Sequence, residues 1–303
     1  MATPEIFDVN PFDGRMKLLT VPFRLAITVI ALAGTSSAVE LDPRALQAWN
    51  EYVKAADSEI SQRVAAGRPF LRFDDFPTEQ KQIQTGEVLV IPRATHGMLD
   101  VPRGLIHDWI GSMFIPNVTL DRVLAVAQDY AHYKDLYKPV VASSKVVRCS
   151  PAEQELSMVW LHHAFARSVA IESELKSHDY DIGNGKWYNV AWATRLQEIE
   201  DFGQRDEHLL PPDQGNGFLW RVHNITKYEQ RDGGTYVEFE GMALSRDIPL
   251  GIRWLVKPIV EQLARISVAT FLRKTRAAVG DSAVAAWPTG SCRTTASFAV
   301  PYP

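Results

Sequence analysis

The feature that most constrains the fold of this chain is a run of β-rich segments followed by one long helical pattern. Turn-rich stretches at 181–185, 211–217 and 232–233 separate several of these segments, and strands joined by tight turns pair as antiparallel neighbours. The order strand, helix, several strands and long helix predicts an α+β fold built on an antiparallel sheet. The expected strands cover residues 104–115, 140–148, 159–177, 187–199, 218–230 and 235–244.

The last element is a helical pattern over residues 249–279. Its apolar residues recur at a spacing that places them on one stripe, and such a stripe usually faces the core. Pro258 is expected to bend this helix, because the periodicity resumes directly after it. The stripe consists of Ile252, Leu255, Val256, Ile259, Leu263 and Ile266.

This order of elements resembles the START-like superfamily, also called the helix-grip or SRPBCC fold, over about residues 97–279. Within that range the segment 245–249 (SRDIP), followed by Trp254, Pro258 and the pair 275–276 (TR), is similar to a block in exported bacterial members. The resemblance implies a curved antiparallel sheet wrapped around the long C-terminal helix, with an apolar cavity between them. It implies no reaction, because the superfamily includes lipid carriers, plant hormone and allergen proteins, polyketide cyclases and oxygenase subunits.

Residues 1–38 are expected to contain a secretory signal peptide. A basic Lys17 precedes an apolar stretch over 26–33, and small residues lead up to Ala38, which is the pattern that a signal peptidase recognises. The apolar stretch is shorter than the roughly 20 residues that span a bilayer, and Arg24 interrupts the segment. We therefore expect export to a periplasm or to the medium, with no stable membrane span after cleavage.

Met16 is a candidate for the true start of translation, since the residues before it have no apolar period.

The rest of the chain divides into three parts. Residues 39–96 are interpreted as an N-terminal helical extension, residues 97–279 as the START-like ligand-binding domain, and residues 280–303 as a flexible tail rich in Ala, Ser, Thr and Pro.

Composition restricts the class of partner. The formal net charge is −4, from 32 basic and 36 acidic residues, and no block of like charges stands out, so nucleic acid is not an expected partner. A 46% hydrophobic content over 303 residues is sufficient to bury a large core. The expected partner is an apolar small molecule or lipid, and the sequence leaves the oligomeric state open.

The turn at Asp232-Gly233 predicts which strand residues face inward. If these two residues form a hairpin loop, Tyr228 lies opposite Val237 on one face and Lys227 opposite Glu238 on the other. Alternation along the neighbouring strands then assigns the inward side chains. The candidate ligand-binding residues are His163, Arg167, Tyr188, Trp192, Trp220, Val222, Asn224, Thr226 and Phe239.

Arg167 has a specific interpretation among these residues. A buried arginine keeps its charge and needs an anionic or carbonyl partner. An acidic head group on Arg167, with an apolar tail against Trp192 and Trp220, would fit a small-molecule site. Two alternatives remain: inward aromatic residues also describe an ordinary core, and Arg167 at a strand end would reach water.

The sequence offers little evidence of catalysis. It has no serine-hydrolase elbow, no phosphate-binding loop and no zinc-protease motif. His162 and His163 are neighbours on an expected strand and point to opposite faces, so they do not share a metal ion easily. We assign no catalytic residue, metal or cofactor. Paired glutamates are weak acid–base candidates, and two pairs lie on faces expected to be solvated: Glu172 with Glu174, and Glu238 with Glu240.

The two cysteines have two interpretations. Cys149 and Cys292 are an even pair in a chain expected to be exported, and an oxidising compartment permits a disulfide. They are equally compatible with two unrelated thiols.

Three functions remain open from the sequence. The preferred one is an exported protein that holds an apolar or lipid-like molecule. A cyclase or aromatase-type enzyme would use cavity groups such as His163 and Arg167 on an enolisable substrate. A structural envelope module would have a filled core and no cavity.

Overall fold

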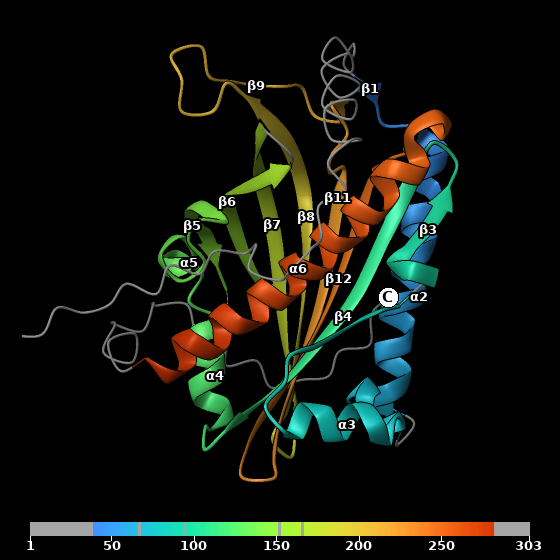
Figure 1. Ribbon diagram of the computed structural model, residues 1–303. Coiled ribbons are helices and arrows are strands. Elements are labelled where there is room, and N and C mark those ends of the chain that lie inside the picture. Colours follow the sequence, from blue (N-terminus) through green and yellow to red (C-terminus); the bar gives the residue numbers. More distant parts are fainter. Residues whose placement is uncertain (1–38, 66–67, 94, 151–152, 165–166, 282–303) are drawn as a thin grey trace, which may run out of the picture. The chain divides into compact units, whose positions relative to one another are not determined.

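The structure of the protein is a computed structural model (Figure 1). The predicted signal peptide and nearly all of the predicted tail, with Cys292, lie outside the described residues. Within the part of the chain that is described, no helix has the length and apolar character needed to cross a membrane. The described residues are 39–65, 68–93, 95–150, 153–164 and 167–281.

One ten-stranded antiparallel sheet forms the body of the molecule. Its order is β2-β4-β12-β11-β8-β7-β6-β5, with β3 paired to β4 and β9 paired to β8. The strands β1 (Val39–Glu40) and β10 (Gln214–Gly215) form a separate short pair. The strands of the large sheet are β2 (Leu89–Pro92), β3 (Met98–Val101), β4 (Gly104–Pro116), β5 (Val141–Cys149), β6 (Glu153–Ala164), β7 (Arg167–Gly183), β8 (Lys186–Glu200), β9 (His208–Leu209), β11 (Arg221–Arg231) and β12 (Gly234–Arg246).

The helices lie on both sides of this sheet. The long C-terminal helix α6 crosses in front of it, and α2 runs beside β4 (Figure 1). This arrangement confirms the predicted α+β helix-grip fold. The helices are α2 (Pro43–Ala65), α3 (Pro77–Gln84), α4 (Leu120–Ala127), α5 (Tyr133–Leu136) and α6 (Arg253–Gly280), with 3-10 turns η2 (Arg72–Asp75), η3 (Thr95–Gly97), η4 (Tyr130–His132) and η5 (Leu250–Ile252).

The predicted hairpin register is confirmed. Tyr228 pairs with Val237 and Lys227 with Glu238 across the β11–β12 turn, where Asp232 and Gly233 both have positive φ angles. The turn therefore sets the alternation of both strands, as expected for a two-residue loop.

The β-rich segment 159–177 is divided between two strands. It contains the end of β6 and most of β7, which pair with each other, for example Trp160 with Ile171. The sequence remains β-rich across the connection, so composition alone gives no sign of where the chain reverses.

Each face of the sheet has its own helical cover. We call the side covered by α6 the α6 face. There Met113, Tyr228 and Val237 from β4, β11 and β12 share a buried cluster with Leu272 of α6. Near β5–β7, a second cluster joins Tyr130, Tyr133 and Tyr137 to Leu156, Met158 and Leu175.

We call the opposite side the α2 face. Trp49 and Ile60 of α2 share a buried cluster with Val190, Ile225 and Tyr236 from the sheet. In α2, the buried positions recur at spacings of three, four or seven residues, which places them on one side of the helix. The sheet is thus apolar on both faces.

Cys149, the last residue of β5, is disulfide-bonded.

Candidate functional site

The helix α6 contacts the sheet tightly along only its second half. Its buried residues all lie from Val268 onward, whereas every residue from Arg253 to Ser267 is half-buried or exposed. The buried residues are Val268, Ala269, Leu272, Thr275, Ala278 and Val279.

A glycine lets α6 approach the sheet where it crosses β4. A Cβ atom on Gly111 would lie 2.5 Å from Val268 Cγ1 and 2.6 Å from Leu272 Cδ1, closer than packed carbon atoms can come. Deeper along the helix, the Thr275 hydroxyl lies 2.9 Å from the Tyr137 hydroxyl and donates to the Phe271 carbonyl at 3.0 Å. These contacts fix the second half of α6 on the α6 face.

The apolar stripe predicted for α6 is not the stripe that packs. Leu263 and Ile266 are 36% and 47% exposed, and Leu255 and Ile259 are only half-buried. The packed face instead includes small and polar residues such as Ala269 and Thr275, because Gly111 favours close approach there. Helical periodicity identifies apolar stripes but does not tell which of them meets the sheet.

The packed face changes character in the first half of the helix. Seven residues make about two helical turns, so the side that carries Val268 continues backward through Glu261 to Trp254, with Lys257 beside them. This side of the helix is thus mainly apolar and buried from Val268 onward, but carries the charged residues Lys257 and Glu261 before it.

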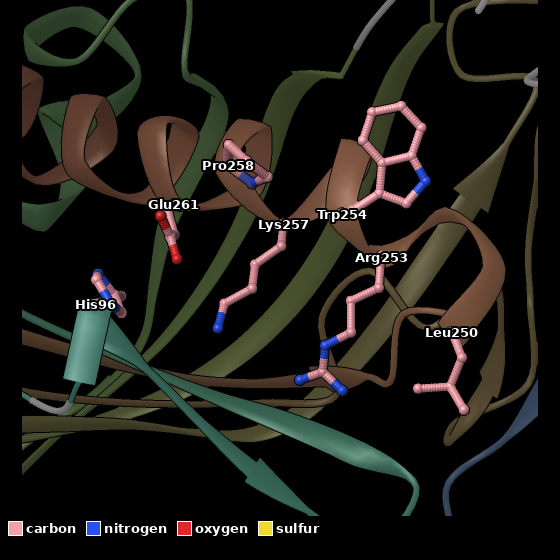
Figure 2. A pocket seen from close by; sticks show the side chains of 7 residues that line it. All are labelled: His96, Leu250, Arg253, Trp254, Lys257, Pro258 and Glu261. Carbon is pink, nitrogen blue, oxygen red and sulfur yellow. The ribbon is translucent and has the colours of Figure 1, made fainter.

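A pocket of about 530 Å³ lies along this polar part of α6. Figure 2 shows Arg253, Lys257 and Glu261 extending from the side of α6 on which His96 lies. The pocket is lined by His96 of η3, Leu250 of η5, and Arg253, Trp254, Lys257, Pro258 and Glu261 of α6.

The charges at this pocket are only partly paired. Arg253 is ion-paired with Asp100 of β3. Lys257 and Glu261 stand one turn apart, yet neither forms a salt bridge with any residue that the structure describes. Two apolar side chains of the lining, Leu250 and Trp254, are 83% and 77% exposed.

Four of the candidate ligand-binding residues lie on the α6 face. Val222, Asn224 and Thr226 alternate along β11 with Tyr228, which is in the cluster with Leu272. Phe239 of β12 contacts Phe271 of α6, with ring centroids 4.6 Å apart. Thr226 is buried, whereas Val222, Asn224 and Phe239 are half-buried. The structure thus brings these four together under the helix.

The inward orientation predicted for Tyr188 and Trp192 is wrong. In the β8–β11 pairing, Tyr188 lies opposite Lys227 and Trp192 opposite His223, whereas Trp187 lies opposite Tyr228. Residues paired across strands share a face, so Tyr188 and Trp192 belong to the α2 face. Their rings pack in the cluster that contains the α2 residues.

Trp220 also belongs to that cluster. It precedes β11, is 5% exposed, and groups with the α2-side residues Leu41 and Leu244. A parity count from Tyr228 does not extend to it because Trp220 lies before the strand begins.

His163 and Arg167 are placed by their backbone alone. They lie at the adjoining ends of β6 and β7, where His163 pairs with Ser168 and Ala164 with Arg167. Their side chains lie outside the described part of the structure, so the acid-binding role predicted for Arg167 stays a prediction.

A buried histidine and a serine form a pair that sequence analysis missed. His107 Nε2 lies 2.8 Å from Ser245 Oγ, and burial lowers the pKa of His107 to about 4, so the imidazole is neutral at pH 7. Its Nδ1 has no hydrogen-bond partner among the described residues. This pair lacks the carboxylate that orients histidine in a hydrolase triad.

The α2 face holds buried charges where a solvated surface was expected. Glu238 and Glu240 are 2% and 7% exposed, because α2 and the η2 segment cover them. Glu238 accepts hydrogen bonds from Lys227 Nζ at 2.8 Å and from the Arg72 amide at 3.0 Å. The prediction that this glutamate pair is solvated is therefore wrong.

A buried aspartate lies beside Glu240. Asp108 is 1% exposed and accepts a hydrogen bond from the Tyr52 hydroxyl of α2. Burial and the nearby Glu240 carboxyl raise the pKa of Asp108 to about 8, and burial raises the pKa of Glu240 as well. Arg93 lies 3.4 Å from Glu240 and offsets part of this effect. These groups join α2 to the sheet.

Within the described residues, no group of three or more histidine, cysteine, aspartate or glutamate side chains could hold a metal ion.

The sequence contains a signal that could have identified the pocket residues. Lys257 and Glu261 interrupt the side of the helix that Val268 and Thr275 continue, and a charged interruption of a core-facing side is the signal that could have identified them. This signal is missed when the more apolar stripe of α6 is taken as the side that packs on the sheet.

The elements together form a helix-grip fold in which the first half of the terminal helix has no buried residue. The sequence matches no protein-family profile and no curated protein. Among solved structures, a STAR-related lipid transfer protein from Xanthomonas axonopodis is similar at 14% identity and a TM-score of 0.42, over 64% of this chain and 99% of that one.

Two other solved structures are also similar. A protein from Thermus thermophilus has 19% identity and a TM-score of 0.40, over 56% of this chain and 94% of its own. The Zhui aromatase/cyclase of Streptomyces sp. R1128 has 11% identity and a TM-score of 0.36, over 59% and 98%.

Proposed function

We propose that this protein binds an apolar or lipid-like small molecule between its sheet and the first half of α6. The observation that carries the proposal is the contrast along α6. From Val268 onward the helix is packed, and before it no residue is buried. Close packing is the normal state of a protein interior, so an unpacked half of a core helix suits an occupant from outside the chain.

The side chains that face this region support an apolar occupant. Val222 and Phe239 on the sheet are half-buried. Asn224 supplies a polar group on the same face. Small-molecule sites combine an apolar lining with a few polar groups that fix orientation, and this region has both.

The experiment is native mass spectrometry of the chain from Val39 onward, purified from its own exported fraction, followed by solvent extraction. We expect a stoichiometric apolar molecule to be retained in the native spectrum and released on denaturation. The bare chain mass, together with no rise in melting temperature across a panel of lipids, would contradict the proposal and support a structural module instead.

We further propose that the protein is exported, with cleavage after Ala38. The disulfide-bonded state of Cys149 supports an oxidising compartment, as does the signal-like segment before Val39. N-terminal sequencing of the protein from its native cell should give Val39 as the first residue. An intact N-terminus in the cytosolic fraction would exclude this proposal.

A further inference from the structure

The ammonium group of Lys257 lacks a salt-bridge partner among the described residues, unlike the lysines of three pairs elsewhere in the fold. Lys227 is 2.8 Å from Glu238, Lys176 is 3.0 Å from Glu153, and Lys186 is 3.5 Å from Glu229. Lys257 is half-buried but forms no salt bridge within the described part of the chain. A partly desolvated cation without a counter-charge favours an anion from outside the chain.

The nearest acid of the same helix does not neutralise Lys257. Glu261 is four residues further on, a spacing that permits an ion pair on a helix. In Figure 2 the Lys257 side chain extends away from the helix axis, between His96 and Arg253, while Glu261 lies closer to His96. The ammonium therefore faces the pocket beside the guanidinium of Arg253.

Arg253 has donors to spare at the same pocket. Its only described ion-pair partner, Asp100, is bonded through one terminal nitrogen and is 61% exposed. A guanidinium has five N–H donors and suits the planar, paired oxygens of carboxylate and phosphate. Lys257 and Arg253 together can contact one such group.

The rest of the pocket is suited to an attached apolar chain. Leu250 and Trp254 line the pocket and remain largely exposed, so two large apolar side chains lie open to solvent beside the charged groups. An amphiphile would cover them while its charged end lies at the lysine.

We propose that the pocket at the start of α6 binds the anionic head group, a carboxylate or phosphate, of the apolar ligand, with Lys257 and Arg253 as its recognition groups. This inference rests on the proposed function, because it names the class of ligand held at the same helix.

The test compares amphiphiles that differ only in the head group. Binding of hexadecanoic acid, hexadecanol, hexadecyl phosphate and inorganic phosphate to the full mature chain is measured by isothermal titration. We expect the acid and the alkyl phosphate to bind about tenfold more tightly than the alcohol, the gain typical of one charge-assisted hydrogen bond. Inorganic phosphate alone should bind at least a hundredfold more weakly than the alkyl phosphate.

Two substitutions at the pocket should act in opposite directions. Lys257→Gln should reduce affinity for the acid to that of the alcohol and leave the alcohol unchanged. Glu261→Gln, which removes a negative charge facing the anion, should tighten acid binding about threefold at low salt. Lys54→Gln on the exposed side of α2 is the matched control and should change neither affinity. The melting temperature of each variant checks its folding.

The outcomes separate the two proposals. If the alcohol binds as tightly as the acid, and Lys257→Gln changes nothing, the head-group site is wrong while the apolar-ligand function stands. If inorganic phosphate binds as well as the alkyl phosphate, the pocket is a free-anion site and the amphiphile proposal is overturned. If no amphiphile binds, both proposals fail.

Discussion

The Tyr52 hydroxyl of α2 donates a 2.6 Å hydrogen bond to the Asp108 carboxyl of β4. The bond joins residues 56 positions apart in the sequence and lies in a layer of ionisable groups that includes Glu240 and the half-buried Arg93. Because this layer attaches the N-terminal helix to the sheet, the stability of the whole fold should depend on its state of ionisation.

Asp108 should make the protein less stable as the pH rises. Its pKa is about 8 in the folded chain, against an ordinary value of 3.8, so between these values the folded state holds a proton that the unfolded state has released. The free energy of unfolding therefore falls from about pH 4 to pH 8 through this group. Asp108→Asn should remove much of that slope, measured by urea unfolding at pH 5 and pH 8. Equal slopes in both proteins would show that Asp108 is ionised throughout.

Loss of the Tyr52 hydroxyl should have a cost of its own. Tyr52→Phe leaves a buried carboxyl oxygen without its donor, which typically costs about 1–3 kcal/mol. The substitution preserves the ring that packs between α2 and the sheet, so the hydroxyl is isolated as the variable. Unfolding in urea at pH 5 measures the difference, and a change near zero would mean that water replaces the hydroxyl.

The ion pair between Lys227 and Glu238 should be costly to break from one side. Its side chains are 7% and 2% exposed, and removing one partner of a buried pair typically costs about 3–5 kcal/mol. We expect a loss of that size for Lys227→Met. The double variant Lys227→Met with Glu238→Gln should recover part of it, since no buried charge remains unpaired.

An exposed ion pair supplies the control for this experiment. Arg195 and Glu174 are 42% and 49% exposed, and such pairs contribute about 0–1 kcal/mol. Arg195→Ala should therefore leave the urea midpoint nearly unchanged. A loss at Arg195 as large as that at Lys227 would contradict the dependence on burial.

The two halves of α6 should respond differently to the same substitution. Leu272→Ala empties a fully buried position and should cost about 2–5 kcal/mol. Leu263→Ala, at a position 36% exposed, should cost less than about 1 kcal/mol. Chemical unfolding of both variants measures the contrast. A large loss of stability at Leu263 would mean that the first half of the helix is part of the core.

Enlarging Gly111 should disturb the helix crossing. A methyl group there meets Val268 at 2.5 Å, and overpacking of this kind typically costs about 1–3 kcal/mol. Val268→Ala in the same chain should recover part of the loss. Gly280→Ala, with no atom within 4 Å of the added carbon, should be nearly neutral. Melting curves of the three variants decide the matter.

Sequence analysis succeeded where local chemistry determines structure. The Asp232-Gly233 turn fixed the pairing of Tyr228 with Val237, and from it followed the placement of Val222, Asn224 and Phe239 under α6. A cap of similarly local origin begins α4, where the Thr119 side chain accepts a hydrogen bond from the Arg122 amide. Turn and cap geometry depend on neighbours in the chain, so one sequence is sufficient to find them.

Sequence analysis failed where the burial of a residue depends on segments distant in the chain. Strand β8 has Trp187 and Tyr188 side by side, both 8% exposed, because α6 and α2 cover opposite faces of the sheet. Because neither face of β8 is consistently polar, the alternation of polar and apolar residues does not show which face Tyr188 occupies. Similarly, Glu238 is buried because Lys227 and the η2 backbone satisfy it, and no local pattern reveals such partners.

The close approach at Gly111 divides α6 into a part that stabilises the fold and a part proposed to recognise the ligand. All buried residues of α6 lie at or after this crossing, so substitutions among residues 254–263 should alter what the protein recognises with little loss of stability. Ligand specificity can therefore evolve through substitutions in the first turns of α6, while the last turns, which pack near Gly111, maintain the fold.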